Sequence, residues 1–387
     1  MTKKRSIQIS LPWTGEEEWL ALKDPLINGW VTQGPNVAAF EKSFAKKHNV
    51  KHAIATSSCT TGLHLILASM GIGEGDEVLV PSFTWISTAN AVLYCGATPV
   101  FVDVDPLTYN IDPKDIAAKL TTKSKAIIVV HLFGLCVDMD LIRAAIPDNI
   151  KIIEDCACAA GASYKNVSAG GLGDAASFSF HPRKSITTGE GGMVTTNNDK
   201  LAETVNILRN HGASISEEQR HKGPKPYLLP EFNLLGFNYR MTDLQGAIGL
   251  VQLDKLEQIT TTRHKWAEFY CKELASIDWL RMPIIPKDGS NHAWQAFVTY
   301  VDNKKAPFTR NQIMSRLQAK GISTRPGTHA VHMLGYYRKR FGINMNDLPG
   351  ARDCDLNTMA IPLHNRMSTD DYNFIVESIF DINNKTN

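Results

Sequence analysis

The chain has 387 residues, of which 43% are hydrophobic and 21% are charged, and its formal net charge is +2 at pH 7. These are globular proportions for one large or two smaller domains, and the charge argues against a nucleic-acid or acidic-lipid binder. The seven cysteines are odd in number and scattered, which favours free thiols in a reducing cytoplasm over a disulfide framework.

No export signal or membrane span is predicted. The basic start, Met1 to Arg5, runs into the polar stretch SIQISLPWTGEEEWL and not into the apolar core of a signal peptide. The longest apolar run, AIIVVHLFGLCV, is too short to cross a bilayer and contains His131. We therefore expect a cytoplasmic protein.

The first two-thirds of the chain alternates strand-like and helix-like segments. Strands are predicted for the apolar, β-branched runs KHAIAT, DEVLVPS, TPVFVDV, KAIIVVHLF and IKIIEDC. Helices are predicted between them for TTGLHLILASMG, ISTANAVLYCG, DPKDIAAKL and DMDLIRAAI. This α/β pattern predicts a mostly parallel sheet covered on both faces, with ligands bound beyond the carboxyl ends of its strands.

The last third reads differently. A polar, proline-rich loop is predicted for residues 214–232, and one long amphipathic helix from Met241 to Leu274. A strand at 293–301 and helices at 309–321 and 369–380 follow. We therefore predict a large domain over residues 1–252 and a smaller C-terminal α/β domain over residues 253–387.

The stretch TSSCTTG follows the first predicted strand and opens a helix. Free N–H groups and the helix dipole at such a start attract anions, and Ser58, Thr60 and Thr61 add donors. The alternative is that these hydroxyl groups simply cap the helix. This stretch alone does not decide between the two.

Three more residues near strand ends are best interpreted together with this helix start. Asp155 ends IKIIED, Trp85 follows the strand in VPSFTW, and Lys184 precedes a glycine cluster in SFHPRKSITTGEGGMVTT. Separately they read as an arginine-paired acid, a core aromatic residue and a solvated lysine. Together they supply what pyridoxal phosphate needs: an anion site, an acid for the ring nitrogen, a flat face and an amine for the aldehyde. The combination predicts a pyridoxal 5'-phosphate enzyme in which Lys184 forms the imine.

Longer segments then follow one another in a recognisable order. They are WVTQGPNVAAFEKSFAKKHNVKHAIATSS, PSFTWISTANAVLYCGATPVFVDVDPLTYNID, VHLFG, IIEDCACAAGA, SFSFHPRKSITTGEGGMV, GFNYRMTDLQGAIGLVQL and IPLHNRMSTDDYNFIV. In this order they resemble the DegT/DnrJ/EryC1/StrS family of pyridoxal-phosphate sugar aminotransferases over nearly the whole chain. The resemblance implies the aspartate aminotransferase (type I) fold, with a large cofactor-binding domain and a small C-terminal domain.

The resemblance also implies roles for the matching residues. Lys184 would hold the cofactor as an imine and later move the proton, Asp155 would pair with the ring nitrogen, and Trp85 would lie over the ring. The phosphate would be held by the backbone of Cys59 and Thr60 and by the Ser179 hydroxyl.

Other residues are implied at the edges of the site. Asn238 would reach the phosphate in the neighbouring subunit, so that a homodimer shares its active sites. Arg240 is a candidate for the substrate carboxylate, with an ordinary ion pair as the alternative. Arg325 and His332 match a loop near the sugar, with a surface arginine and a loop histidine as the alternative.

Two cysteines depart from the family pattern. Cys158 stands where the family usually has Gln, whose side chain reaches the ring hydroxyl of the cofactor, and a thiol is a weak hydrogen-bond partner. Cys59 stands where Gly or Ala is usual, but contacts through its backbone do not depend on its side chain.

The expected reaction is the transfer of an amino group, with glutamate as donor, to a nucleotide-linked keto sugar in amino-sugar or polysaccharide biosynthesis. Similarity to perosamine-synthase-like members favours a 4-keto-6-deoxyhexose. The alternatives are a sugar dehydratase of the same family, whose members have His in place of Lys184, an aminotransferase for a cyclitol or an aromatic precursor, and a non-catalytic cofactor-binding paralogue.

No metal site is predicted. The pair Cys156 and Cys158 lacks a second pair at ligand spacing, and His329 and His332 lack an acidic third ligand nearby.

Overall fold

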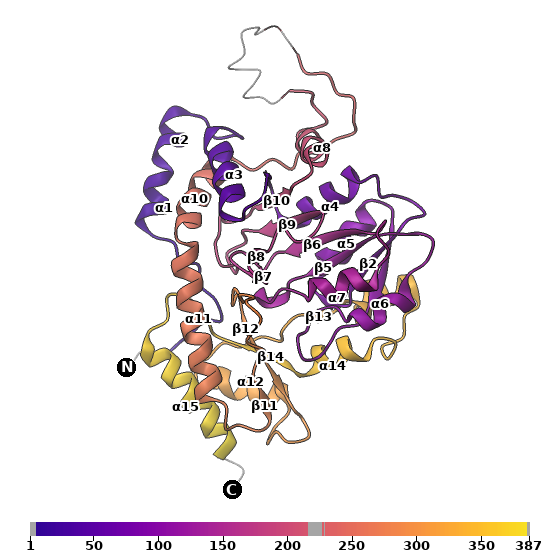
Figure 1. Cartoon of the computed structure of the whole chain (residues 1–387). Helices are drawn as coiled ribbons and strands as arrows, with labels where there is room; N and C mark the ends of the chain where they lie inside the picture. The colour runs from indigo at the N-terminus through magenta and orange to yellow at the C-terminus, as the bar shows by residue number, and fades with distance from the viewer. Residues whose placement is uncertain (1–4, 216–226, 228, 385–387) are drawn as a thin grey trace.

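The computed structural model describes residues 5–215, 227 and 229–384, and Figure 1 shows how its elements are arranged. The described residues contain a seven-stranded central sheet with the order β1-β10-β9-β6-β5-β2-β4. Its strands are β1 (His52–Thr56), β2 (Glu77–Pro81), β4 (Thr98–Val102), β5 (Ser124–Val130), β6 (Lys151–Cys156), β9 (Ala175–Ser179) and β10 (Gly192–Thr196). All neighbouring strands are parallel except β10, which runs antiparallel to both β1 and β9. The predicted, mostly parallel α/β sheet is confirmed.

Helices cover both faces of this sheet. One face packs against α4 (Cys59–Ser69), α5 (Ser87–Tyr94) and α8 (Asp199–Arg209). The other packs against α3 (Pro35–Lys47), α6 (Pro113–Lys119), α7 (Met139–Ala145) and α10 (Asp243–Asp254). Alternate strand residues supply the two cores, because successive side chains of a strand point to opposite faces.

Several of these helices begin where the sequence supplies a capping residue. Asp138 caps α7, Asn198 caps α8, and Thr242 forms a capping box with Gln245 at α10. Each side chain accepts a hydrogen bond from an N–H group that has no partner within its helix. These caps explain why α7 and α10 begin close to their predicted positions, whereas α8 was not predicted.

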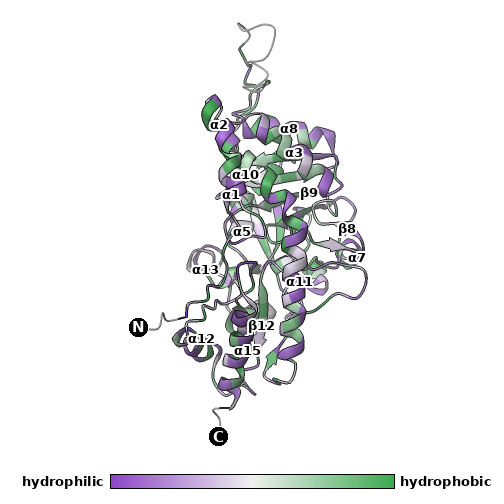
Figure 2. Ribbon diagram, turned by 90° about the vertical axis from the view of Figure 1, so that its left-hand side faces the viewer, coloured by the Kyte–Doolittle hydropathy of each residue, from purple (hydrophilic) through white to green (hydrophobic). Residues whose placement is uncertain are grey.

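The C-terminal part has its own apolar core around an antiparallel sheet, β11 (Leu280–Arg281), β12 (Phe297–Val301) and β14 (Thr358–Ile361). It packs against α11 (Leu256–Glu273), α12 (Arg310–Ala319) and α15 (Thr369–Asn384). Figure 2 shows that α11 and α15 carry hydrophobic and hydrophilic residues side by side, as expected for helices that bury one face. The boundary at residues 252 and 253 stays a prediction.

Shorter elements complete the described structure. They are α1 (Glu16–Ala21), α2 (Lys23–Asn28), β3 (Phe83–Thr84), the 3₁₀ turn η1 (Leu132–Gly134), β7 (Ser163–Tyr164), β8 (Val167–Ser168), β13 (His329–Ala330), η2 (Val331–Met333), α13 (Gly335–Phe341) and α14 (Pro349–Asn357). Among them β13 pairs with β3 in a separate two-stranded sheet, so a segment of the C-terminal part returns to the residues that follow the end of β2.

Two predictions of detail need correction. The long helix is two helices, α10 and α11, which meet at Lys255. The strand predicted at 293–301 begins only at Phe297, because Trp294 has a φ of 49°, outside the range of a strand. Strand β10 was not predicted. Most of the predicted loop at 214–232 lies outside the described residues.

No helix in the described part of the chain is both long enough and apolar enough to cross a membrane.

Candidate active site

Helix α4 begins where β1 ends, and its first turn combines a cap with free donors. Ser58 and Thr61 form a capping box: the Ser58 hydroxyl accepts from Thr61 N at 3.1 Å, and Thr61 Oγ1 accepts from Ser58 N at 3.0 Å. The capping interpretation of these hydroxyl groups is therefore correct. The N–H groups of Cys59 and Thr60 come first in the helix and have no acceptor within it, so they can hold an anion.

A glycine in β10 allows this strand to pack closely against the start of α4. A side chain at Gly192 would place its Cβ 2.7 Å from Cys59 N and 2.6 Å from Ser58 O, closer than real Cβ atoms come. Gly192 pairs with Ser179 at the end of β9. The half-buried Ser179 thus lies across the ladder from the residue that abuts the start of α4, at the carboxyl end of its own strand.

Asp155 lies near the carboxyl end of β6 on the face covered by α4 and α5. Its side chain is 3% exposed. Thr88 of α5 donates to its Oδ2 at 2.8 Å and Ala157 N to its Oδ1 at 3.1 Å, while the Cys59 thiol lies 3.8 Å from Oδ1. Since a carboxylate accepts about four hydrogen bonds, Asp155 keeps acceptor capacity for a donor that comes from the site.

Lys184 follows β9 in a loop that folds onto its own backbone. Lys184 N donates to His181 O at 2.9 Å, and Thr188 N to Phe180 O at 3.0 Å. The Lys184 ammonium donates to Cys158 Sγ at 3.3 Å. Burial lowers the pKa of Lys184, but the nearby Cys158, Cys59 and Asp155 raise it more, and the net direction is upward. The free amine therefore rests as an ammonium close to the Asp155 carboxylate.

Trp85 and His329 form an open aromatic edge beside these residues. Trp85 directly follows β3 and is 60% exposed, which is unusual for a tryptophan without a ligand or partner. The pairing of β3 with β13 brings the exposed His329 beside it, with ring centroids 5.7 Å apart. The Thr84 and Thr88 hydroxyls, 3.0 Å apart, link this edge to Asp155.

Residues 238–240 run past the start of α4. Ser57 N donates to Tyr239 O at 2.9 Å, and Arg240 donates to Asn210 Oδ1 at 2.6 Å. The side chain of Asn238 is exposed. No ion pair of Arg240 occurs among the described residues, so its ordinary reading as a salt-bridge partner gains no support.

Arg325 and His332 are not brought together. Arg325 is exposed, and its backbone pairs with Ala360. His332 is fully buried, with Nδ1 2.5 Å from Ser82 Oγ and Nε2 3.3 Å from Met345 O. Burial lowers the pKa of His332. The structure does not favour the predicted sugar contact of His332, because both of its nitrogens face protein atoms.

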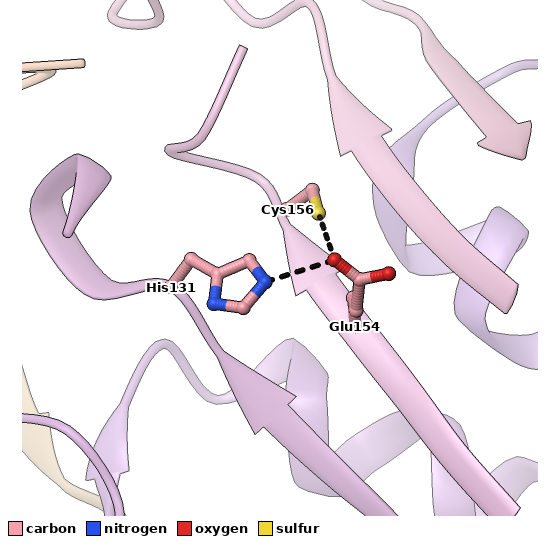
Figure 3. Close-up of side chains that lie close together, drawn as sticks. All are labelled: His131, Glu154 and Cys156. Atoms are coloured by element: carbon pink, nitrogen blue, oxygen red, sulfur yellow. Dashed lines mark hydrogen bonds and ion pairs between the residues drawn. The ribbon is translucent and has the colours of Figure 1, made fainter. Parts of the chain in front are cut away.

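A second polar cluster lies on the opposite face of β6, where His131, Glu154 and Cys156 come together (Figure 3). The Glu154 carboxylate accepts from His131 Nε2 at 2.9 Å, from Gly170 N and Leu172 N at 2.8 Å each, and from Gly173 N at 2.7 Å.

This cluster is built to hold the fold and not a metal ion. His131 Nδ1 accepts from Val137 N at 3.2 Å, so the hydrogen of the ring is on Nε2 and faces Glu154. Burial raises the pKa of Glu154, but the His131 hydrogen bond and the backbone N–H groups lower it more, so the net direction is downward. Neither His131 nor Glu154 has a lone pair left for a cation.

Two residues of the site were missed in the sequence. Thr88, which holds Asp155, lies inside a helix that gave only an apolar pattern, and nothing local marks it. His329 was considered only with His332 as a possible metal ligand, and nothing in the sequence marks which of the two is exposed.

The described residues fit pyridoxal phosphate. The free N–H groups of α4 suit its phosphate, and only a glycine fits at position 192 against this helix start. Asp155 retains capacity to accept from the ring nitrogen, and Lys184 supplies an amine.

Comparison with known proteins agrees with this geometry. Residues 12–380 match the DegT/DnrJ/EryC1/StrS aminotransferase family. The chain is 39% identical to the spore coat polysaccharide biosynthesis protein SpsC of Bacillus subtilis over 99% of both chains. It is 40% identical to the GDP-perosamine synthase of Caulobacter vibrioides over 90% of this chain and 91% of that one.

Solved structures give the same result. The pyridoxal-phosphate form of Spr1654 from Streptococcus pneumoniae superposes with a TM-score of 0.90 at 27% identity, over 98% of this chain and 99% of that one. The chain therefore belongs to the DegT/DnrJ/EryC1/StrS aminotransferase family, a family of pyridoxal-phosphate-dependent sugar aminotransferases.

Proposed function

We propose that the enzyme moves an amino group from glutamate to a nucleotide-linked 4-keto-6-deoxyhexose, in the biosynthesis of an amino sugar for a surface polysaccharide. The observation that carries the substrate class is the 40% identity to GDP-perosamine synthase over 90% of the chain. The likeness to SpsC, named for spore coat polysaccharide biosynthesis, points the same way.

The residues of the site divide the work of holding the cofactor. The Cys59 and Thr60 N–H groups and the Ser179 hydroxyl bind the phosphate at the start of α4. Trp85 offers a flat face, and Asp155 keeps a proton on the ring nitrogen. When bound, the cofactor supplies an electron sink for the carbon that loses its proton.

Lys184 provides the amine and the proton transfer. With the cofactor bound, Nζ would be the amine that joins its aldehyde, and once free it would be the group that takes and returns the proton. Asp155 and the nearby thiols raise the pKa of Lys184, so the free amine would have to lose a proton before it acts in either role. Cys158, 3.3 Å from Nζ, holds the amine on the side where the family usually has Gln.

The open edge suits a large substrate. His329 and Trp85 are both exposed at the rim, and we propose His329, in place of His332, as the histidine that contacts the sugar. Arg240 remains a proposed contact for the glutamate carboxylate, and Arg325 remains a proposed contact near the sugar.

The site is proposed to be shared in a homodimer. Exposed apolar side chains lie at the end of α2 and near Asn238: Ile27 is 71% and Leu235 is 91% exposed. Figure 2 shows the hydrophobic end of α2 at the periphery of the molecule. A second copy that covers this surface would bring its Asn238 to the phosphate. Since none of the seven cysteines is paired, a reducing cytoplasm remains the proposed location.

The test is a screen of nucleotide-linked keto sugars with glutamate, with products identified by mass. We expect a 4-keto-6-deoxyhexose to gain an amino group while the yellow colour of the enzyme bleaches with glutamate alone. No bleaching with glutamate would remove it as the donor, and amination of cyclitol substrates only would replace the proposed substrate class.

Sharing of the site is tested by mixing subunits. Lys184→Ala chains and Asn238→Ala chains should each be inactive, and mixed dimers should regain activity because one of their two sites is whole. No recovery after confirmed subunit exchange would remove the shared-site proposal.

A further inference from the structure

Cys158 and Lys184 form a thiol–amine pair inside the site. The ammonium of Lys184 donates to Cys158 Sγ at 3.3 Å, and both residues are half-buried, so a small solute can reach them. Cys158 follows the end of β6 in a turn, and Lys184 lies in the loop after β9, so the contact joins two strand ends of the sheet.

No other cysteine has this setting. Burial raises the pKa of the thiols of Cys59, Cys156, Cys136 and Cys354, and it raises that of Cys95 and of Cys271 to about 11. Their hydrogen-bond partners, where the described residues supply one, are carboxylates or carbonyl groups. Oxidants attack thiolates that are accessible and lie beside a cation, which is the position of Cys158.

We propose that Cys158 and Lys184 form a peroxide-sensitive covalent switch, in which oxidation of the thiol leads to a sulfur–nitrogen bond between the two side chains. Cys158 first attacks hydrogen peroxide: a sulfur–oxygen bond forms, the oxygen–oxygen bond breaks, and one water leaves. The sulfur loses two electrons and the peroxide gains them.

The second step is a condensation without further oxidation. The Lys184 amine, in its neutral form, attacks the sulfenic sulfur, the sulfur–oxygen bond breaks, and the hydroxyl group leaves as water with a proton from the nitrogen. Sulfenic acids are known to condense with nitrogen in this way. The product lacks the two hydrogen atoms lost from the thiol and the amine. An added thiol reverses the bond by attack on sulfur and, in a second exchange, restores Cys158 and frees Lys184.

The consequence rests on the proposed function of Lys184. A lysine bound to sulfur offers no amine to the cofactor, so a cross-linked chain is inactive. Conversely, a Lys184 joined to the cofactor has no free amine for sulfur. The sulfur–nitrogen bond can therefore form only when the Lys184 amine is not joined to the cofactor. This is the case after the donor has given up its amino group.

The experiment treats the full-length enzyme, loaded with pyridoxal phosphate, with hydrogen peroxide in the presence and absence of glutamate. Remaining thiols are blocked, the protein is digested, and peptides are analysed by mass. We expect a peptide that joins the Cys158 and Lys184 segments and lacks two hydrogen atoms, more abundant with glutamate. Activity should fall by the cross-linked fraction and return with dithiothreitol.

Variants separate this bond from other oxidation. Cys158→Ser and Cys158→Ala should lose the joined peptide and the reversible part of the inactivation, each measured against its own untreated activity. Lys184→Arg keeps a cation but should trap Cys158 as a blocked or further oxidised thiol. Cys271→Ser is the matched control, since Cys271 is also half-buried but has no amine partner, and it should respond like the wild type.

Two results would overturn the inference. One is oxidation of Cys158 to sulfinic acid, or to a disulfide with Cys59, with Lys184 unmodified. The other is the same reversible inactivation in Cys158→Ser. Failure of the proposed function looks different: the joined peptide would form equally with and without glutamate, and amino transfer would be unaffected by it.

Discussion

Glu154 and Asp155 are neighbours in β6, but their side chains leave the strand on opposite faces and differ in how many hydrogen bonds they accept. Glu154 accepts four hydrogen bonds, from His131 and from three backbone N–H groups, and has no capacity left. Asp155 accepts two strong ones, from Thr88 and Ala157 N, and one weak contact from Cys59. The comparison shows that the two carboxylates differ in spare acceptor capacity and not in burial, and only the proposed cofactor face has such capacity left.

The largest expected effect is on the face of β6 that carries Asp155, where Lys184 also lies. Lys184→Ala should lower turnover by about 10⁴-fold or more, because both the amine and the proton transfer are lost. The variant should still fold, since a half-buried side chain at a strand end adds little to the core. Absorbance spectra measure the loss of the imine between lysine and cofactor, and single-turnover rates measure the loss of turnover. Borohydride reduction that fixes the cofactor on another lysine would contradict it.

The next largest effect is on the opposite face of β6, which carries Glu154. Glu154→Ala should cost about 3–5 kcal/mol in the free energy of unfolding, because the His131 N–H and three backbone N–H groups lose their buried acceptor. Urea unfolding measures it. Glu154→Gln, which keeps one acceptor oxygen, is the matched control and should lose less. A fully stable Glu154→Ala chain with impaired amino transfer would reverse the roles of the two faces.

Asp155→Asn should bind cofactor but turn over about 10²-fold more slowly or worse, because the ring nitrogen loses its proton. Its free energy of unfolding should change little, since the amide oxygen can still accept from Thr88. Steady-state rates and the ultraviolet–visible spectrum of the bound cofactor give the two readings. Turnover close to that of the wild type would make Asp155 an ordinary strand-end acid.

Thr88→Val is expected to cost about 1 kcal/mol of transition-state stabilisation, roughly a fivefold lower rate, because it removes one hydrogen bond that fixes Asp155. Thr88→Ser keeps the hydroxyl and should restore most of the rate. If both variants are equally slow, the methyl packing of Thr88 matters and not its hydrogen bond.

The smallest effect depends on pH. The pKa of Glu154 is lowered in the folded state, so its contribution to stability is complete above its unfolded pKa of about 4.3 and is lost as pH falls through the lower, folded value. The difference in unfolding free energy between wild type and Glu154→Gln should therefore shrink below about pH 4.3. A difference that is constant from neutral to acidic pH would mean that Glu154 is not ionised in the fold.

Much of this site was predictable, because each parallel strand ends at the same edge. The apolar runs located β1 and β6, and so placed the start of α4 and Asp155 at that edge. What could not be predicted depends on contacts between distant segments. The pairing of β13 with β3 exposes His329 and buries His332, although both lie in the same short motif.

Local patterns also failed where the backbone departs from them. The break between α10 and α11 at Lys255 lies inside a continuous amphipathic pattern, and nothing in the sequence marks it. Strand β10 begins at Gly192, next to a glycine cluster that reads as a loop.

The pairing of β13 with β3 has a consequence for how the enzyme matures. The pairing beside Trp85 joins residues 83–84 to residues 329–330, so it cannot form until the later segment has been made. Ile7 likewise bridges to Ile322, far along the chain. Contacts between segments so far apart in the sequence form slowly and late. Buried residues of the last third, among them Val298, Val331 and Ala360, also belong to the core on one face of the large sheet. We therefore expect nascent chains that end before β13 to contain every strand of this sheet and Lys184, yet to lack part of that core and the pairing beside Trp85.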